Sequence, residues 1–388
     1  MKNALPFLID VSRLVGRLMK GRLPTGVDRV ALAYVRQYGD RSRAFVREGR
    51  FHIVLNEKLS YSLFHLLLAP PDDFKAQAWR LIAQGAAAGI RQRDLSGSVF
   101  LNIGHSGLEY HRYPDLLKKM KVKPVFLVHD LIPITHPEYC RTGEGERHRV
   151  RMKTVLELAQ GVITNSRATL DELARFADVL GMQLPPAQPA FLAPPAFTNF
   201  GLPRPVARPY FVVLGTIEPR KNHLLVLQVW KRLVEQWGDQ APLLVLIGQR
   251  GWECENVVDL LERCEALKSH IIERASCSDA ELVTWLQHAQ ALLFPSFTEG
   301  FGLPLVEALA CGTPVIASNL QVFAEIAGDL PDYCDPLDAL GWLELVADYS
   351  SPGSQKRTAQ LQRITNYKPP TWQEHFNKVE LLLRQIVS

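Results

Sequence analysis

The chain has 388 residues, of which 47% are hydrophobic and 22% are charged, and its formal net charge is +4 at pH 7. This length predicts two or three globular domains, and so small a net charge gives no case for a nucleic-acid partner. No stretch approaches the roughly 20 apolar residues of a membrane span, and the six cysteines form no C-x-x-C pair, so we expect no zinc site and a reducing cytoplasm.

The N-terminal half alternates short apolar runs with longer amphipathic segments, a pattern typical of parallel strands covered by helices. Strands are predicted at residues 7–9, 98–103, 125–128 and 162–164, and helices at residues 26–38, 75–88 and 168–180. We interpret the first strand as part of the fold and not of a signal peptide, because Asp10 interrupts the apolar run and no cleavage site follows. Prolines between residues 185 and 195 end the pattern.

The same alternation resumes after residue 208. Strands are predicted at residues 210–214, 243–247, 291–294 and 314–317, with a further strand ending near residue 272. Helices are predicted at residues 222–237, 255–267, 335–349, 355–367 and 372–387. Ser278 and Glu281 have the spacing of a capping box, which indicates another helix start.

Two halves of this kind predict an α/β protein with two Rossmann-like domains that face a cleft. We assign residues 1–198 to an N-terminal domain, 199–208 to a linker, 209–370 to a C-terminal domain, and 371–388 to a C-terminal helix that packs back on the N-terminal domain. Ligands of open parallel sheets bind beyond the carboxyl ends of the strands, so residues that follow strands are the site candidates.

The segment FPSFTEGFGLPLVEALACGTPVIAS, residues 294–318, is the most specific motif of the chain. It places Glu299 and Glu307 eight positions apart, with Gly300 and Gly302 after the first acid. A glycine turn followed by a proline-initiated helix leaves backbone amides free to meet electron-rich oxygens, while carboxylates accept bonds from hydroxyl groups. This combination suits a ligand with both phosphates and hydroxyls, such as a nucleotide sugar. The alternative is a simple turn with Glu307 complementing the helix dipole.

Two adjacent cations, Arg220 and Lys221, follow the strand at 210–214 and the turn at Gly215. Arginine binds phosphate oxygens bidentately and lysine acts as a point charge, so the pair suits a diphosphate. Cations fixed at this place would stabilise a departing diphosphate more in the transition state than in the ground state. The alternative is a solvated surface arrangement of Glu218 with one of the two cations.

These motifs resemble those of the retaining glycosyltransferases of family 4, which have the GT-B fold, and the 294–318 segment resembles their E-x7-E region. The resemblance covers most of the C-terminal half, including residues 214–222, 248–252 and 370–376, and is weaker at residues 25–30 and 128–133. At residues 370–376 the chain resembles bacterial O-antigen, capsule and exopolysaccharide transferases, among which mannosyltransferases using GDP-mannose are frequent.

The resemblance implies that the N-terminal domain binds the acceptor and that the C-terminal domain binds the nucleotide sugar. It also implies a role for each part of the donor site. Glu299 would lie near the donor sugar, and Glu307 would accept hydrogen bonds from the ribose. Phe301, Gly302 and Leu303 would present backbone amides to the donor. The turn at residues 275–278, which includes Cys277, is the expected place of the nucleobase edge.

On the acceptor side, the resemblance places His129 near the transferred sugar, with Asp130 beside it. A neutral imidazole could hydrogen-bond a sugar hydroxyl, and an imidazolium could oppose the diphosphate. Gly26 would let the chain approach a phosphate or the acceptor. Family members often have an arginine where this chain has Gly215, so the phosphate arginine is either Arg220 or Arg250.

We therefore predict a retaining, metal-independent hexosyltransferase that needs no cofactor and contains no D-x-D motif. Its donor would be a nucleotide-diphosphate sugar, with GDP-mannose favoured, and its acceptor a glycan or a polyprenyl-diphosphate-linked sugar in cell-surface polysaccharide assembly. The alternatives are a nucleotide-sugar 2-epimerase of similar fold and a non-catalytic assembly partner.

Basic residues crowd two stretches of the N-terminal half, at Arg13, Arg17, Lys20, Arg22 and Arg29 and at Lys118, Lys119, Lys121 and Lys123. They suggest a cytoplasmic protein that docks peripherally on the anionic inner face of the membrane. The alternative is an ordinary solvated basic face.

Overall fold

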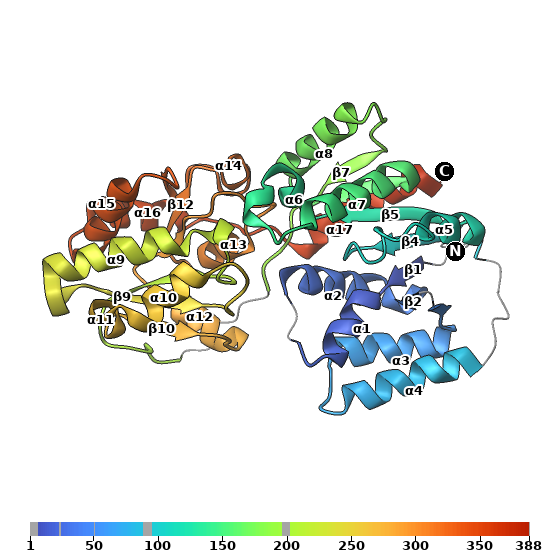
Figure 1. Ribbon diagram of the computed structural model, residues 1–388, viewed down its shortest axis with the longest axis horizontal. Coiled ribbons are helices and arrows are strands. Elements are labelled where there is room, and N and C mark those ends of the chain that lie inside the picture. The colour runs from blue at the N-terminus through green and yellow to red at the C-terminus, as the bar shows by residue number, and fades with distance from the viewer. Residues whose placement is uncertain (1–6, 23–24, 50, 88–94, 196–201, 388) are drawn as a thin grey trace. The chain divides into compact units, whose positions relative to one another are not determined.

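The structure is a computed structural model that describes residues 7–22, 25–49, 51–87, 95–195 and 202–387 (Figure 1). The chain divides into two compact units. Unit 1 consists of residues 1–131, 146–190 and 372–388, and unit 2 consists of residues 132–145 and 191–371. Each unit is built around one sheet covered by helices, which is the α/β class that the sequence predicts.

The sheet of unit 1 has seven strands in the order β3-β2-β1-β4-β5-β6-β7. Only β2 and β3 pair in antiparallel fashion. The strands are β1 (Phe7–Asp10), β2 (Ser42–Glu48), β3 (Phe51–Val54), β4 (Val99–Asn102), β5 (Lys123–Val128), β6 (Gly161–Thr164) and β7 (Ala187–Pro189). The four predicted strands are the fully buried ones, whose apolar runs are nearly continuous. The sequence analysis missed β2, β3 and β7. In β2, charged residues flank the apolar run, and β3 and β7 are short strands without a fully buried residue.

The helices of unit 1 include the three predicted in the N-terminal half, which are α2 (Gly26–Tyr38), α4 (Phe74–Ala87) and α8 (Arg167–Val179), and the predicted C-terminal helix α17 (Trp372–Val387). Ala88, the predicted end of α4, lies outside the described residues. The others are α1 (Ser12–Met19), α3 (Glu57–Leu68), α5 (Tyr113–Met120) and α7 (Glu144–Leu158).

The sheet of unit 2 has six strands in the order β10-β9-β8-β11-β12-β13, all of them parallel. They are β8 (Tyr210–Leu214), β9 (Leu243–Ile247), β10 (Ile271–Arg274), β11 (Leu292–Phe294), β12 (Val315–Ser318) and β13 (Asp332–Cys334). A buried apolar core that includes Trp230 and Trp342 lies between this sheet and its helices.

The helices of unit 2 follow the predicted pattern with local differences. They are α6 (Ile132–Thr135), α9 (His223–Trp237), α10 (Glu255–Arg263), α11 (Glu265–Lys268), α12 (Asp279–Gln287), α13 (Leu303–Ala310), α14 (Gln321–Ala327), α15 (Ala339–Ser350) and α16 (Gln355–Ile364). The single helix predicted at residues 255–267 is interrupted because Cys264 has extended backbone angles. The predicted capping box of Ser278 and Glu281 is present at the start of α12.

The predicted N-terminal domain, residues 1–198, includes two segments that belong to unit 2, namely residues 132–145 and 191–198. The Tyr139 ring stacks on Phe297 with ring centres 5.1 Å apart, and the Arg141 guanidinium lies 5.1 Å from the Trp252 ring centre. These contacts join partners far apart in the sequence, which no local pattern could indicate.

The C-terminal helix α17 packs on β6 and β7 of unit 1, as the sequence predicts (Figure 1). Its residue His375 is buried between Tyr34 of α2 and the chain after β7. His375 Nδ1 lies 3.2 Å from the Ala190 carbonyl oxygen, and His375 Nε2 lies 2.9 Å from the Tyr34 hydroxyl. Because the carbonyl can only accept, Nδ1 carries the proton and Nε2 accepts from the hydroxyl.

Replacing His375 with alanine is expected to lower the free energy of unfolding by about 3 kcal/mol, because it leaves a cavity and two unpaired polar groups. Tyr34→Phe, which removes only the hydroxyl, should cost about 1 kcal/mol. Urea denaturation measures both changes. The exposed His111→Ala serves as the control, and an H375A midpoint equal to that of the control would contradict this account.

Candidate functional site

The two cations predicted to bind a diphosphate lie in a short 3-10 turn after β8, at Pro219–Lys221. Pro219 opens this turn, and Asn222 ends it in the left-handed conformation (φ 55°) directly before α9. Lys221 is 7% exposed and Glu218 is 4% exposed. Such burial excludes the alternative of a solvated surface arrangement at this turn.

Glu299, in the loop after β11, contacts both cations. Its carboxylate forms an ion pair with the Lys221 ammonium and lies 2.7 Å from Arg220 Nη1. It also accepts a hydrogen bond from the Ser296 hydroxyl at 2.8 Å. On its other side, Arg220 Nε lies 2.5 Å from Glu218. Two cations and two carboxylates thus form one cluster, which we call the donor cluster: Glu218, Arg220, Lys221 and Glu299.

The charged groups of the donor cluster are stabilised by one another and not by water. Burial alone would raise the pKa of Glu299, but Arg220 and Lys221 outweigh it and lower that pKa to about 2. Burial lowers the pKa of Lys221, an effect that Glu299 opposes. The aromatic ring of Phe294, 4.8 Å from Lys221 Nζ, adds a favourable contact for the ammonium.

The helix α13 begins at the place where the sequence analysis predicts backbone amides that are free to bind a ligand. Gly302 precedes it with φ 117°, and a Cβ there would lie 2.8 Å from the Phe323 ring, so only glycine suits this position. Within the described part of the chain, the amides of Phe301, Gly302 and Leu303 donate to no recorded acceptor. Glu307 lies in the second turn of α13 and is buried. These amides are available for a ligand oxygen.

The loop after β9 approaches the turn after β8 closely. Gly248 has no side chain because a Cβ there would overlap the carbonyl of Gly215, and Ile217 bridges to Arg250. The Arg250 side chain, however, points to other partners. It pairs with Glu262 and makes two bonds to Glu273, at 2.8 and 2.9 Å. Of the two candidate phosphate arginines, only Arg220 is part of the donor cluster.

The remaining predicted donor residues lie in loops of unit 2. Cys277 follows β10, and its side chain is half-buried. Gly300 directly follows Glu299 in the loop before α13.

The candidates His129, Asp130 and Gly26 belong to unit 1. His129 follows β5, is buried, and places Nε2 2.7 Å from the Ile103 carbonyl oxygen. That bond puts the proton on Nε2 and leaves Nδ1 as an acceptor. Burial is the main cause that lowers the pKa of His129, so the imidazole is neutral at pH 7.

A pocket of about 330 Å³ brings these unit 1 residues together. His129, Asp130 and Val27, the neighbour of Gly26 at the start of α2, line it. So do residues that the sequence analysis did not select, namely Arg13, Arg47, Gly104, His105, Ser106, Gly107, Glu109, Tyr110 and Arg151. The available signal was the sequence Gly104-His-Ser-Gly107, a glycine turn directly after a buried strand.

The basic stretch near the N-terminus is only partly a surface feature. Arg13 and Arg17 both form ion pairs with the carboxylate of Asp28, at 2.9 and 2.8 Å, and Asp28 is 1% exposed. Asp28 also caps α2 by accepting from the Thr25 amide at 2.8 Å. Two of the five basic side chains therefore neutralise a buried carboxylate of unit 1.

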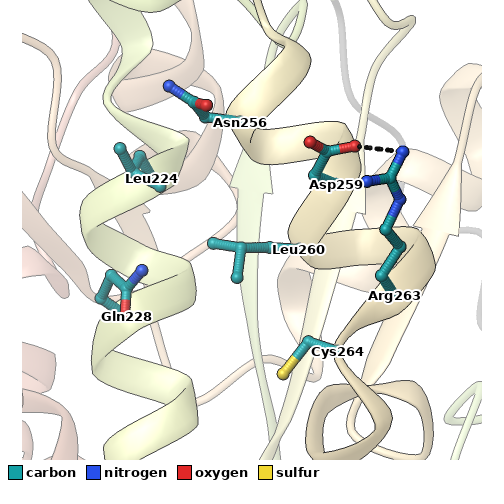
Figure 2. A pocket seen from close by; sticks show the side chains of 7 residues that line it. All are labelled: Leu224, Gln228, Asn256, Asp259, Leu260, Arg263 and Cys264. Carbon is teal, nitrogen blue, oxygen red and sulfur yellow. Dashed lines mark ion pairs between the residues drawn. The ribbon is translucent and has the colours of Figure 1, made fainter.

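A second cavity, of about 480 Å³, lies in unit 2 between α9 and α10 (Figure 2). Its lining comprises Leu224, Gln228, Asn256, Asp259, Leu260, Arg263 and Cys264. Its one arginine pairs with Asp259 at 3.1 Å. The cavity contains none of the predicted site residues, so the candidate site is elsewhere.

In the described ranges, no three His, Cys, Asp or Glu side chains gather in the way a metal site requires. None of the helices that the structure describes combines the length and apolar character needed to cross a membrane.

Comparison with known proteins gives a consistent result. The family described as glycosyl transferases group 1 matches residues 197–332, which include Lys221, Glu299 and Glu307. O-antigen chain mannosyltransferase B of Escherichia coli is 27% identical over 277 residues, covering 68% of this chain and 71% of that protein. The serotype-specific mannosyltransferase WbdA of Escherichia coli is 27% identical over 286 residues, covering 67% of this chain and 33% of WbdA. The match thus spans about a third of WbdA.

The crystal structure of Anabaena Alr3699/HepE in complex with UDP-glucose resembles the whole chain. It superposes with a TM-score of 0.65 and covers 98% of both chains at 15% identity. Identity this low shows the fold alone. The predicted GT-B fold class is thereby confirmed.

Neutralising Glu299 as Glu299→Gln should lower the free energy of unfolding by about 3 kcal/mol at pH 7, because it breaks a buried ion pair. The folded pKa of Glu299 lies below its usual value of 4.5, so its contribution is present above pH 4.5 and is lost as pH falls toward 2. The difference between wild type and variant should therefore be about 1 kcal/mol smaller at pH 4 than at pH 7.

Urea denaturation at the two pH values measures this difference. The matched control is Glu235→Gln, at an exposed position of α9. A destabilisation by Glu299→Gln that is the same at both pH values would argue against the ion pair as its cause.

Proposed function

We propose that the protein transfers a hexose from a nucleotide-diphosphate sugar to an acceptor hydroxyl with retention of configuration, because residues 197–332 match the family described as glycosyl transferases group 1. The acceptor is a glycan or a polyprenyl-diphosphate-linked sugar of a cell-surface polysaccharide. The observation that carries this proposal is the donor cluster beside the open amides of α13. The mannosyltransferase relatives favour mannose, with GDP-mannose as the donor.

In this proposal Arg220 and Lys221 bind the donor diphosphate. The bond from the anomeric carbon to the diphosphate oxygen breaks, and the acceptor oxygen bonds to the same face of that carbon. The acceptor proton passes to the departing phosphate oxygen, so no separate base is needed. Cations held in advance stabilise the charge that develops on this leaving group. They perform the electrostatic work of a metal ion, and we propose that none is required.

The donor's uncharged parts meet the rest of the site. The amides of Phe301, Gly302 and Leu303 bind donor oxygens, and Glu307 accepts hydrogen bonds from the ribose hydroxyls. Glu299 positions both cations and accepts from the sugar hydroxyls.

The turns at Gly215 and Gly300 leave space for the donor beside these residues, and the chain near Cys277 meets the nucleobase. In unit 1, the unprotonated Nδ1 of His129 accepts a hydrogen bond from a hydroxyl of the transferred sugar. Asp130 and the helix start at Gly26 bind the acceptor.

Lys221→Ala is expected to lower turnover on the order of 100-fold, the scale of losing one preorganised electrostatic group. The measurement is acceptor-dependent release of nucleoside diphosphate, with GDP-mannose and UDP-glucose compared as donors. Lys231→Ala, at an exposed position of α9, is the matched control and should retain wild-type turnover.

Near wild-type turnover in Lys221→Ala would show that Lys221 does not stabilise the leaving group. An epimerase would instead release a free epimerised sugar without any acceptor, and a non-catalytic protein would release no nucleotide with any donor. Either result would refute the transferase proposal.

We also propose that the protein acts at the cytoplasmic face of the membrane, where the exposed lysines Lys118, Lys119 and Lys121 meet anionic lipid. Lys123 is excluded from this set because its ammonium donates to the Ile386 carbonyl at 2.7 Å.

Sedimentation with vesicles that contain anionic phosphatidylglycerol should recover the protein at low salt and lose it at high salt. Substituting all three exposed lysines with glutamine should lower the affinity for these vesicles on the order of 100-fold, since each lysine contributes about 1 kcal/mol. Binding that is equal on neutral vesicles, or unaffected by salt, would speak for an ordinary solvated face.

A further inference from the structure

The loop after β4 in unit 1 is shaped by two arginine side chains that lie against it. A Cβ on Gly104 would lie 2.8 Å from the Arg13 side chain, and a Cβ on Gly107 would lie 2.8 Å from the Arg47 guanidinium. Gly107 also has φ 85°, and His105 between them has φ 55°. A non-glycine residue with positive φ is uncommon and often marks a functional segment. The loop therefore accommodates one arginine from α1 and one from β2.

Arg47 is held firmly but has no carboxylate partner within ion-pair distance among the described residues. Its guanidinium lies 4.5 Å from the Tyr110 ring centre, and its Nη1 donates to the Gly49 carbonyl at 3.0 Å. Its Nε is buried and lacks a hydrogen-bond partner. A buried guanidinium nitrogen without an acceptor is costly, and a bound oxyanion would remove that cost.

Arg13 also has bonding capacity that the protein does not use. Its Nε donates to Asp28 at 2.9 Å, and Asp28 is shared with Arg17. One carboxylate thus serves two guanidinium groups. No further hydrogen bond of Arg13 is recorded within the described residues, so its terminal N–H groups remain available beside the Gly104 loop.

The other charged groups near this pocket are engaged with each other or with polar neighbours. Arg151 pairs with Glu109 at 3.3 Å, and Asp130 also lines the wall. Behind Arg47, the buried carboxylate of Asp10 accepts from the Ser12 amide at 2.9 Å. His105 donates from Nε2 to the Leu127 carbonyl at 2.9 Å, and burial lowers its pKa, so it adds no positive charge. The available donors are therefore mainly those of Arg13 and Arg47.

We infer that the pocket formed by Arg13, Arg47 and the Gly104–Gly107 loop binds a phosphate-class oxyanion. Guanidinium groups match phosphate oxygens with paired N–H donors, and the Ser106 hydroxyl adds a further donor on the loop. The pocket lies beyond the carboxyl ends of β4 and β5, the usual ligand position of such sheets. Under the proposed function, on which this step rests, the oxyanion is a phosphate ester of the acceptor.

The test uses the full chain carrying Lys221→Ala, so that the donor cluster contributes less to anion binding. Titration calorimetry with inorganic pyrophosphate should detect binding that Arg47→Gln weakens by about tenfold or more. Arg80→Gln, at an exposed position of α4, is the matched control and should leave the affinity unchanged.

A second measurement does not depend on a folded Arg47 variant. Pyrophosphate should protect Arg47 of the otherwise unaltered chain from modification by phenylglyoxal, as mapped by mass spectrometry, while Arg80 should react equally with and without it. Affinity that Arg47→Gln does not change, together with no protection of Arg47, would overturn the inference. The inference would also be overturned if the protein bound no pyrophosphate but bound uncharged methyl α-mannoside in a way that Arg47→Gln weakens.

Two further arms separate the sources of the phosphate. Arg47-dependent binding of glycerol 3-phosphate supports a soluble phosphorylated acceptor, and Arg47-dependent binding only to vesicles containing phosphatidic acid supports a lipid-linked one. None of these arms contains a nucleotide sugar. A failure of sugar transfer would therefore refute the proposed function without affecting the pocket, and the reverse also holds.

Discussion

The ion pairs of Glu299 with Arg220 and Lys221 are the interaction on which the donor side depends. They join the loop after β11 to the turn after β8, and a bond of 2.9 Å from the Phe297 amide to the Arg220 carbonyl joins the two main chains. A buried charge without a partner is too costly to persist, so neither loop can hold its charge alone. Under the proposed function, the cations are thus positioned before a donor arrives, as electrostatic preorganisation requires.

Sheet topology is what allows this pairing. Lys221 and Glu299 are 78 positions apart, yet β8 and β11 are parallel neighbours, so their carboxyl ends lie at one edge of the sheet. Unit 1 repeats the arrangement with β4 and β5, which bring the Gly104 loop and His129 to one pocket. In both units, a close approach of chain segments requires glycine at defined positions.

The two units differ in how their charges are balanced. In the donor cluster of unit 2, the two cations and the two carboxylates are bonded to each other. In unit 1, Arg47 rests on an aromatic ring and keeps donor capacity. If both sites bind phosphate, the donor phosphates must compete with the carboxylates of the donor cluster for its cations. The acceptor phosphate would instead meet N–H groups of Arg47 that no carboxylate among the described residues engages.

The sequence alone determined the buried strands, most long helices, the capping box at Ser278 and the candidate residues of the E-x7-E segment. Those signals are local, because apolar runs, caps and glycine-proline turns act over a few neighbouring residues. Only the tertiary structure decided that Glu299 pairs with Lys221, that residues 132–145 pack with unit 2, and that Arg47 flanks the Gly104 loop. These contacts join distant parts of the chain, and strand order, which no local pattern encodes, brings them together.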